Sequence, residues 1–205
     1  GRRLALQVYT DAARAGGGTE IAPFTFLDGH CLVQPWATDL LPDEIDLEWA
    51  SRGRGRRVHW VGTIGGGRFG NIREIEPFRR ACADRGVPFI QRGGVPRARH
   101  IALIQESWLA PAIHGTWQVE NGYIACRVFK NISYGQMGLT NSAAANALFD
   151  GQLVYAADTR DLLDRAEAVL RDGDAWVTRT RELMTIVRAR HTYVNRIESI
   201  LSVLS

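Results

Sequence analysis

Residues 58–86, VHWVGTIGGGRFGNIREIEPFRRACADRG, decide the fold of this chain of 205 residues. Val58–Ile64 is an apolar run of strand length, and the glycine-rich turn Gly65–Gly70 ends it. The apolar residues that follow recur at helical spacing as far as Gly86, which suits a helix stop. A strand that passes through a glycine turn into a helix opens a βαβ unit and predicts a parallel sheet.

The start of that helix has two candidates. Asn71 can cap the helix, with Glu74 three residues further on as its capping-box partner. Pro77 lies awkwardly in this register, because proline is tolerated in the first turn of a helix rather than its interior. The helix can therefore begin instead at Pro77.

The alternation of strand and helix continues along the chain. Further strands are expected at residues 87–90, 109–113, 137–140 and 153–156. Helices are expected at residues 98–106 and 127–134, at 143–149 after a cap at Asn141 or Ser142, and from a cap at Asp158 or Thr159 onward. The pattern predicts an α/β fold, a Rossmann-like parallel sheet with helices on both faces, that ends in a long C-terminal helix.

Three units follow from this pattern. Residues 1–50 are too few for a Rossmann-like domain of their own, and they read as a truncated lobe with a linker. Residues 51–175 form the Rossmann-like domain. Residues 176–205 are expected to be one amphipathic helix, whose apolar seam is typical of core packing.

Composition excludes several classes of function. The net charge of +3 is too small to indicate nucleic acid binding, and the arginine-rich run at residues 52–57 reads as a solvated loop, with an RNA-binding patch as the weaker alternative. No apolar run approaches the roughly 20 residues of a membrane span. Cys31, Cys82 and Cys126 are odd in number and lack metal-ligand spacing, so we expect a reducing, cytoplasmic compartment and no metal site.

A polar cluster lies in the second half of the chain. Lys130 is the only lysine, and it follows Arg127 by three residues, so both cations share one face of the predicted helix. Hydroxyl and amide side chains follow at Tyr134 and at Thr140–Ser142. Two fixed cations beside such donors suit a phosphorylated ligand.

The polar segments share one position relative to the predicted sheet. In a doubly wound sheet, ligands bind outside the carboxyl ends of the strands. Gly65–Gly70, His114, Arg127–Gly135 and Thr140–Ser142 all follow strands. We therefore expect them to line one crevice that holds an anionic group, with His114 as the best histidine candidate for contact with the ligand.

The glycines also match a dinucleotide fingerprint. Gly65, Gly67 and Gly70 have its spacing, and glycines at such a turn let backbone amides approach phosphate. A nicotinamide site also needs an acidic residue at the end of the second strand, where this chain has Gln91 and Arg92. Arg92 suits a 2′-phosphate, which keeps an NADP-dependent oxidoreductase as an alternative.

These residues resemble the C-terminal half of a GT-B glycosyltransferase, the half that binds the nucleotide-sugar donor, over about Trp36–Ser205. The segment RVFKNISYG, residues 127–135, looks like the donor-site helix of group-1 and spore-protein-like transferases. The resemblance implies that Gly66 and Gly67 lie near the diphosphate and that Arg127 and Lys130 neutralise it. It also implies that Thr140–Ser142 contact phosphate or sugar, and that residues 1–50 are a remnant of the acceptor lobe.

One departure from that pattern bears on mechanism. Many retaining members carry two glutamates eight residues apart, and the second holds the ribose. Lys130 stands at that position here, and Gly122 lies eight residues before it. The stereochemical outcome is therefore open.

The sequence thus predicts a glycosyltransferase that uses a nucleoside diphosphate sugar as donor, an unknown acceptor and no further cofactor. The alternatives are the NADP-dependent oxidoreductase and a non-catalytic module that binds a nucleotide sugar or a partner. The expected catalytic residues are His114, Arg127 and Lys130, with Asp39 and Glu44 as weaker candidates for a base. The expected donor-binding residues are Gly65, Gly66, Gly67, Asn71, Tyr134, Thr140, Asn141 and Ser142.

Overall fold

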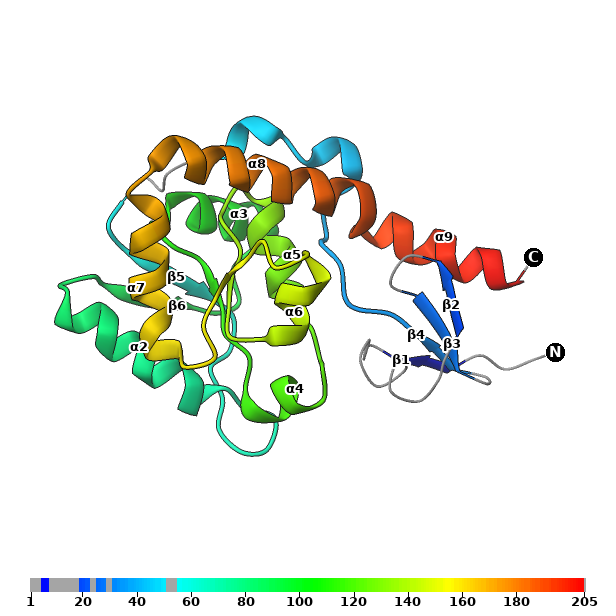
Figure 1. The fold of residues 1–205 in the computed structure, drawn as a ribbon, viewed down its shortest axis with the longest axis horizontal. Coiled ribbons are helices and arrows are strands. Elements are labelled where there is room, and N and C mark those ends of the chain that lie inside the picture. The colour runs from blue at the N-terminus through cyan, green and yellow to red at the C-terminus, as the bar shows by residue number, and fades with distance from the viewer. Residues whose placement is uncertain (1–4, 8–18, 23–24, 29–30, 51–54, 205) are drawn as a thin grey trace.

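The computed structural model describes residues 5–7, 19–22, 25–28, 31–50 and 55–204. They form an α/β body and a small N-terminal sheet, which lies beside the end of the C-terminal helix (Figure 1). Part of the arginine-rich run, residues 52–54, lies outside the described residues.

The body is built on parallel strands. β5 (Val58–Val61) pairs with β6 (Phe89–Arg92), and β8 (Leu139–Thr140) pairs with both β7 (Pro111–Ala112) and β9 (Val154–Tyr155). A parallel bridge from Val58 to Leu109 joins the two groups, so the spatial order is β6-β5-β7-β8-β9. The predicted α/β class with a parallel sheet is confirmed. After β5 the chain forms β6 on one side of that strand, and it then returns to form β7 on the other side of β5. The strand order reverses there, so the boundary between β5 and β7 is a topological switch point.

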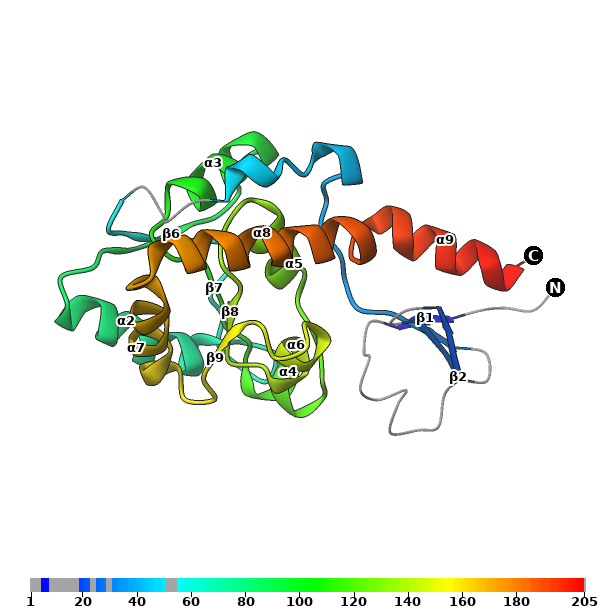
Figure 2. The same cartoon turned by 45° about the horizontal axis from the view of Figure 1, so that its top comes forward.

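Helices lie on both faces of this sheet. They are α2 (Ile72–Asp84), α3 (Arg97–Glu106), α4 (Thr116–Glu120), α5 (Cys126–Ser133), α6 (Ala143–Leu148) and α7 (Thr159–Leu170). α2 packs against α7, and α5 packs against β7 and α8 (Gly173–Arg190). Figures 1 and 2 show α2 and α7 on one side of the body, with α3, α5 and α8 on the other. The short helix α4 has no counterpart in the sequence prediction.

The helix boundaries follow local chemistry, with one correction. α2 begins at Ile72 and contains Pro77, so the alternative start at Pro77 is wrong. Asn71 precedes the helix but makes no capping hydrogen bond with its side chain. At the other end, Gly86 has φ 64° and the amide of Val87 donates to the carbonyl of Cys82 at 2.8 Å, a Schellman stop.

The C-terminal segment is two helices rather than the single one predicted. α8 ends at Arg190, and α9 (Tyr193–Leu204) begins after a break at His191 and Thr192. The carbonyl of His191 accepts a 3.0 Å bond from the amide of Thr38, and Thr38 also bridges Thr192. A local cap also starts α9, because the amide of Thr192 donates to Oδ1 of Asn195 at 3.0 Å and the amide of Asn195 donates to the Thr192 hydroxyl at 3.4 Å. The break between the helices therefore has both a distant partner, Thr38, and a local cap.

The N-terminal sheet has the order β1-β4-β3-β2. Its strands are β1 (Ala5–Gln7), β2 (Thr19–Ala22), β3 (Thr25–Asp28) and β4 (Cys31–Val33). β1 and β4 are parallel, whereas β3 is antiparallel to both of its neighbours. Residues 34–50 then lead to the body through the short 3₁₀ helices η1 (Pro42–Glu44) and η2 (Leu47–Trp49).

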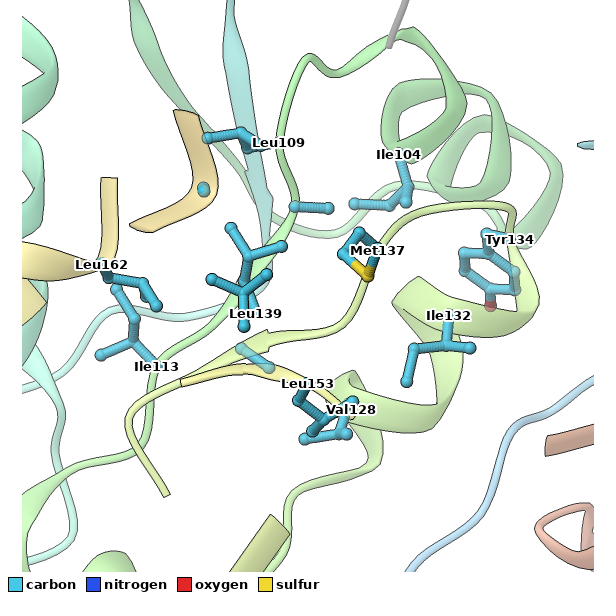
Figure 3. Packing of buried hydrophobic residues seen from close by; sticks show 14 of the residues in the cluster. Ile104, Leu109, Ile113, Val128, Ile132, Tyr134, Met137, Leu139, Leu153 and Leu162 are labelled. Atoms are coloured by element: carbon cyan, nitrogen blue, oxygen red, sulfur yellow. The ribbon is translucent and has the colours of Figure 1, made fainter. Parts of the chain in front are cut away.

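One hydrophobic core runs through the body and fixes α5 in place. Val128, Ile132 and Tyr134 from the α5 region pack with Met137 and Leu139, as Figure 3 shows. All five are at most 1 % exposed. Burying an apolar side chain of this size stabilises a fold by about 1.5–3 kcal/mol. The side chains that α5 presents elsewhere are therefore held on a rigid support.

Candidate functional site

Hydrogen bonds and close backbone contacts hold the two ends of the glycine loop, Gly65–Gly70, together, whereas the residues in its middle have free space beside them. The amide of Gly65 donates to Oδ1 of Asn71 at 3.3 Å, and its carbonyl accepts from the amide of Asn71 at 2.9 Å. A Cβ at Gly70 would lie 2.1 Å from the carbonyl oxygen of Gly65, so only glycine fits there. By contrast, a Cβ at Gly66 or Gly67 would meet nothing within 4 Å. Asn71 therefore closes the loop rather than capping α2.

A pocket of about 330 Å³ lies against this loop and the start of α2, with Arg68 and Arg73 among its lining residues. Glu74 does not complete a capping box, because its carboxylate accepts from the amide of Thr116 at 3.0 Å and from the Thr116 hydroxyl at 2.5 Å. The first turn of α2 is thus tied to α4 across the end of the sheet.

Arg127 lies at the carboxyl end of β5. Its guanidinium stacks over the ring of Trp60, 3.8 Å from the centroid, and donates to the carbonyl of Val61 at 2.5 Å. Gly62 has φ 126°, and a Cβ there would lie 2.7 Å from Nη2 of Arg127, so glycine makes room for the cation. Burial lowers the pKa of Arg127 to about 10, which leaves it charged at neutral pH.

Arg127 has no carboxylate partner among the residues that the structure describes. A partly buried cation without an acidic partner is a costly arrangement for a protein, unless an anion from outside completes it. The switch point of the sheet is where such a ligand is expected to bind.

Lys130 differs from Arg127 in having a partner. Its ammonium lies 3.0 Å from Oδ2 of Asp39, and the hydroxyl of Tyr134 donates to Oδ1 of the same carboxylate at 2.5 Å. Burial opposes ionisation of Asp39, but these two hydrogen bonds outweigh it and hold the pKa of the carboxyl below its ordinary value. Asp39 is therefore a poor base at neutral pH. Glu44, the other candidate, is exposed and pairs with Arg97 at 2.6 Å.

His100 on α3 lies against Tyr134 at the end of α5. Its ring meets that of Tyr134 edge to face, with centroids 5.3 Å apart. Burial, followed by the positive charges of Lys130 and Arg127, lowers the pKa of His100 to about 4. Both cations and Asp39 thus lie close enough to act electrostatically on one imidazole.

The ring of His114, which was expected to be catalytic, is buried, and both of its nitrogens bond to backbone groups. The ring is 1 % exposed, Nδ1 lies 3.0 Å from the carbonyl of Ala112, and Nε2 accepts from the amide of Ala125 at 3.1 Å. This pattern assigns the neutral Nδ1–H tautomer. Burial lowers the pKa of His114 to about 4. Since both ring nitrogens bind backbone, neither is left for a ligand.

Thr140–Ser142 also serve the scaffold. Asn141 accepts from the amide of His114 at 2.8 Å and donates to its carbonyl at 2.9 Å, which pins β7 to β8 beyond their ends. The Thr140 hydroxyl donates to Ala112 at 3.1 Å, and the Ser142 hydroxyl caps α6 by accepting from Ala145 at 3.2 Å. All three side chains are buried, so the geometry does not support the donor contacts expected of them.

Several segments do converge, as the strand order requires. A Cβ at Gly115 would lie 2.0 Å from the carbonyl oxygen of Gly70, so the β7 and β5 loops touch backbone to backbone. The side-chain amide of Asn71 donates to the carbonyl of Ile113 at 3.5 Å, and the backbone amide of Ala125, at the start of α5, donates to Nε2 of His114. Of the residues expected to bind the donor, Gly66 and Gly67 in the middle of the glycine loop are exposed, whereas Arg127 and Lys130 on α5 are half-buried.

Sequence reasoning missed three participants. Trp60 and Gly62 form the seat of Arg127, and the only signal for them was their place at the end of a strand. Asp39 entered only as a possible base, although its contact is with Lys130, 91 residues away in sequence.

The described residues offer no group of three or more His, Cys, Asp or Glu side chains that could hold a metal ion. Within the same residues, no helix is both long and apolar enough for a membrane span.

A parallel α/β body with helices on both faces is compatible with a Rossmann-like fold, and its glycine loop and Arg127 lie at the switch point of the sheet. The family model described as glycosyl transferase-like matches residues 46–202, and the chain belongs to that family. Comparison with curated proteins gives no match, and comparison with solved structures gives none either.

Proposed function

We propose that this chain binds a nucleoside diphosphate sugar and transfers the sugar to an acceptor. The family supports glycosyl transfer in general terms. The site supports the kind of donor, because an open glycine loop and a fixed cation suit a diphosphate. The N-terminal sheet and linker stand in this proposal as the remnant of an acceptor lobe.

The observation that carries the proposal is the state of Arg127. It is partly buried, charged and fixed against Trp60 and Val61, and the described residues contain no acid that pairs with it. An anion is needed to complete it, and the donor of this family's reaction supplies one.

The chemistry follows from where charge develops. The bond between the sugar and the diphosphate oxygen breaks, and negative charge grows on the leaving diphosphate. Arg127 and the backbone amides of the glycine loop stabilise that charge by preorganised electrostatics, and Lys130 adds to the same field. The acceptor hydroxyl must lose a proton to a base. Neither Asp39, whose pKa is lowered, nor His114, whose nitrogens are occupied, suits that role.

The oxidoreductase alternative is not favoured. Arg92 lies at the exposed end of β6, and its guanidinium reaches only the neighbouring carbonyl of Gln91 at 3.4 Å. The family match supports a transferase. A non-catalytic module that binds a nucleotide sugar would share the same ligand and differ only in turnover.

The test is a calorimetric and thermal-shift panel of UDP, GDP, CDP, ADP, NAD and NADP, followed by donor hydrolysis with the matching sugar nucleotide. A ligand that binds the native state raises the melting temperature by mass action. We expect one nucleoside diphosphate to bind and its sugar derivative to be hydrolysed slowly. Binding without hydrolysis or transfer would identify a binding module, and binding of NADP alone would contradict the proposal.

A further inference from the structure

The contact between Asp39 and Lys130 has a role beyond joining two segments. The Lys130 side chain is 22 % exposed and that of Asp39 is 28 % exposed, so the pair lies at the rim of the site rather than in the core. The two remaining lysine protons face away from this single bond. A lysine ammonium is a mobile point charge on a flexible stem, and a fixed partner is what gives it a position.

Asp39 is itself held from three sides. The neighbouring Thr38 is tied to the end of α8 by its amide, which donates to His191 at 3.0 Å, and to the end of α5 by its hydroxyl, 2.7 Å from that of Ser133. Arg97 at the start of α3 donates to the carbonyl of Asp39 at 3.1 Å. These contacts fix the backbone at Asp39, and the hydroxyl of Tyr134 donates to its carboxylate at 2.5 Å.

We propose that Asp39 is a positioning residue, which holds the ammonium of Lys130 in place for the diphosphate of the donor. This inference rests on the proposed function. Asp39 precedes the residues 46–202 that the family model matches, so the linker supplies a part of the site that lies outside the matched region. Asp39 acts through Lys130 and does not touch the reacting atoms.

Because the Asp39 side chain is negatively charged, its replacement should affect donor binding and turnover in different ways. Asp39→Asn removes a negative charge that repels the diphosphate, so the KM for the donor should fall or stay unchanged. The same change frees Lys130 from its fixed position, so stabilisation of the leaving group weakens and kcat should fall about 10-fold. If Asp39 only stabilised the fold, Asp39→Asn would lower the melting temperature and would not lower kcat while leaving KM unchanged or reduced. Asp39→Glu, which restores the charge, should recover part of kcat.

A double-mutant cycle tests whether Asp39 works through Lys130. In the Lys130→Met background, Asp39→Asn should change kcat less than twofold, because the group that it positions is gone. Glu48→Gln is the matched control, since Glu48 lies in the same linker region and, within the described part of the chain, pairs with exposed Arg181 at 2.9 Å. Additive effects of Asp39→Asn and Lys130→Met would overturn the proposal. Failure of the wild-type protein to bind any nucleoside diphosphate would instead overturn the proposed function.

The single lysine allows a direct test of the contact. Lysine labelled with ¹³C at the ε carbon gives one side-chain NMR signal, because Lys130 is the only lysine in the chain. Asp39→Asn should shift this signal in the free protein, and the nucleoside diphosphate that binds the wild type should shift it again. A signal unchanged by Asp39→Asn would contradict the positioning role, whatever ligand the protein binds.

Discussion

Arg127 and Arg196 are two buried cations in opposite situations. Burial lowers the pKa of each to about 10, and neither pairs with a carboxylate among the described residues. Arg196 on α9 is 4 % exposed and donates to the carbonyls of Pro35, Trp36 and Arg190 at 2.9–3.2 Å. It also contacts Nδ1 of His191 at 2.9 Å. These contacts take up four of the five N–H donors of its guanidinium.

Among the described residues, the guanidinium of Arg127 donates to one carbonyl, that of Val61, and otherwise rests on the ring of Trp60. A guanidinium has five N–H donors in a fixed fork, so most of its capacity is left over. The difference teaches how to separate the two kinds of buried arginine. An arginine whose donors mostly meet backbone carbonyls holds segments together, whereas one with spare donors at the end of a strand is the better candidate for binding an anion.

The largest effect should come from Arg127→Met, which keeps the packing on Trp60 and removes the charge. We expect donor turnover to fall by at least about 100-fold, as when one preorganised contact to a developing charge is lost. The melting temperature should change little. Steady-state kinetics and thermal unfolding check both parts, with Arg179→Met as control, because Arg179 donates to the carbonyl of Gln152 at 2.7 Å, outside the site. Unchanged turnover in Arg127→Met would remove the role assigned to Arg127.

Arg196→Met should show the reverse pattern. The change leaves buried carbonyls at the linker and the end of α8 without donors, and breaking such a set costs about 3 kcal/mol of stability. Nucleoside diphosphate affinity of the folded protein should stay within about threefold of the wild type. Urea unfolding and calorimetry measure the two quantities separately. If Arg196→Met kept the stability of the wild type but lost nucleoside diphosphate binding, the distinction drawn between Arg196 and Arg127 would be wrong.

The fold was largely readable from the sequence, because strand and helix periods and glycine stops are local signals. Val58–Val61, α2, α5 and α7 all lie close to where those signals place them. The break at His191 and Thr192 was missed, because its local signal is only the cap formed by Thr192 and Asn195, and its other partner, Thr38, is distant in sequence.

The site was readable only in part. Arg127 stands out by its spacing from Lys130 and its place after strands. Polar residues at strand ends also suggested ligand contacts for His114 and Asn141. The side chain of Asn141, however, bonds to the backbone of His114, and the ring of His114 bonds to backbone groups of Ala112 and Ala125. A sequence does not reveal whether a polar group already has a partner, because that depends on contacts between distant segments.

The structural role of His114 predicts how stability depends on pH. Its folded pKa of about 4 lies below the ordinary 6.5 of histidine, so the neutral form is favoured in the folded state and protonation favours unfolding. The stability that the neutral His114 side chain contributes to the fold is fully present above about pH 6.5, and it is lost as the pH falls from there toward 4. The full loss is roughly 3 kcal/mol, at about 1.4 kcal/mol per pKa unit. Urea unfolding at several pH values, with His114→Asn for comparison, should show a shallower slope in the variant. A kinetic pKa between 6 and 8 that disappears in this variant would instead restore a catalytic role.

Gly115 and Gly66 offer a similar comparison with smaller expected effects, because Gly115 is packed against backbone and Gly66 has free space beside it. Gly115→Ala places a Cβ 2.0 Å from the carbonyl oxygen of Gly70, so the two loops must move apart, at a cost of about 1–3 kcal/mol. Gly66→Ala meets no atom of the protein within 4 Å, so the free energy of unfolding should stay within about 0.5 kcal/mol of the wild type. If a diphosphate lies against the open middle of the glycine loop, the added methyl group of Gly66→Ala should weaken nucleoside diphosphate binding by about 10-fold. Calorimetry on both variants decides the matter. Full affinity in Gly66→Ala would mean that the ligand does not approach the loop there, and Arg127 would then have to bind its anion from the α3 side.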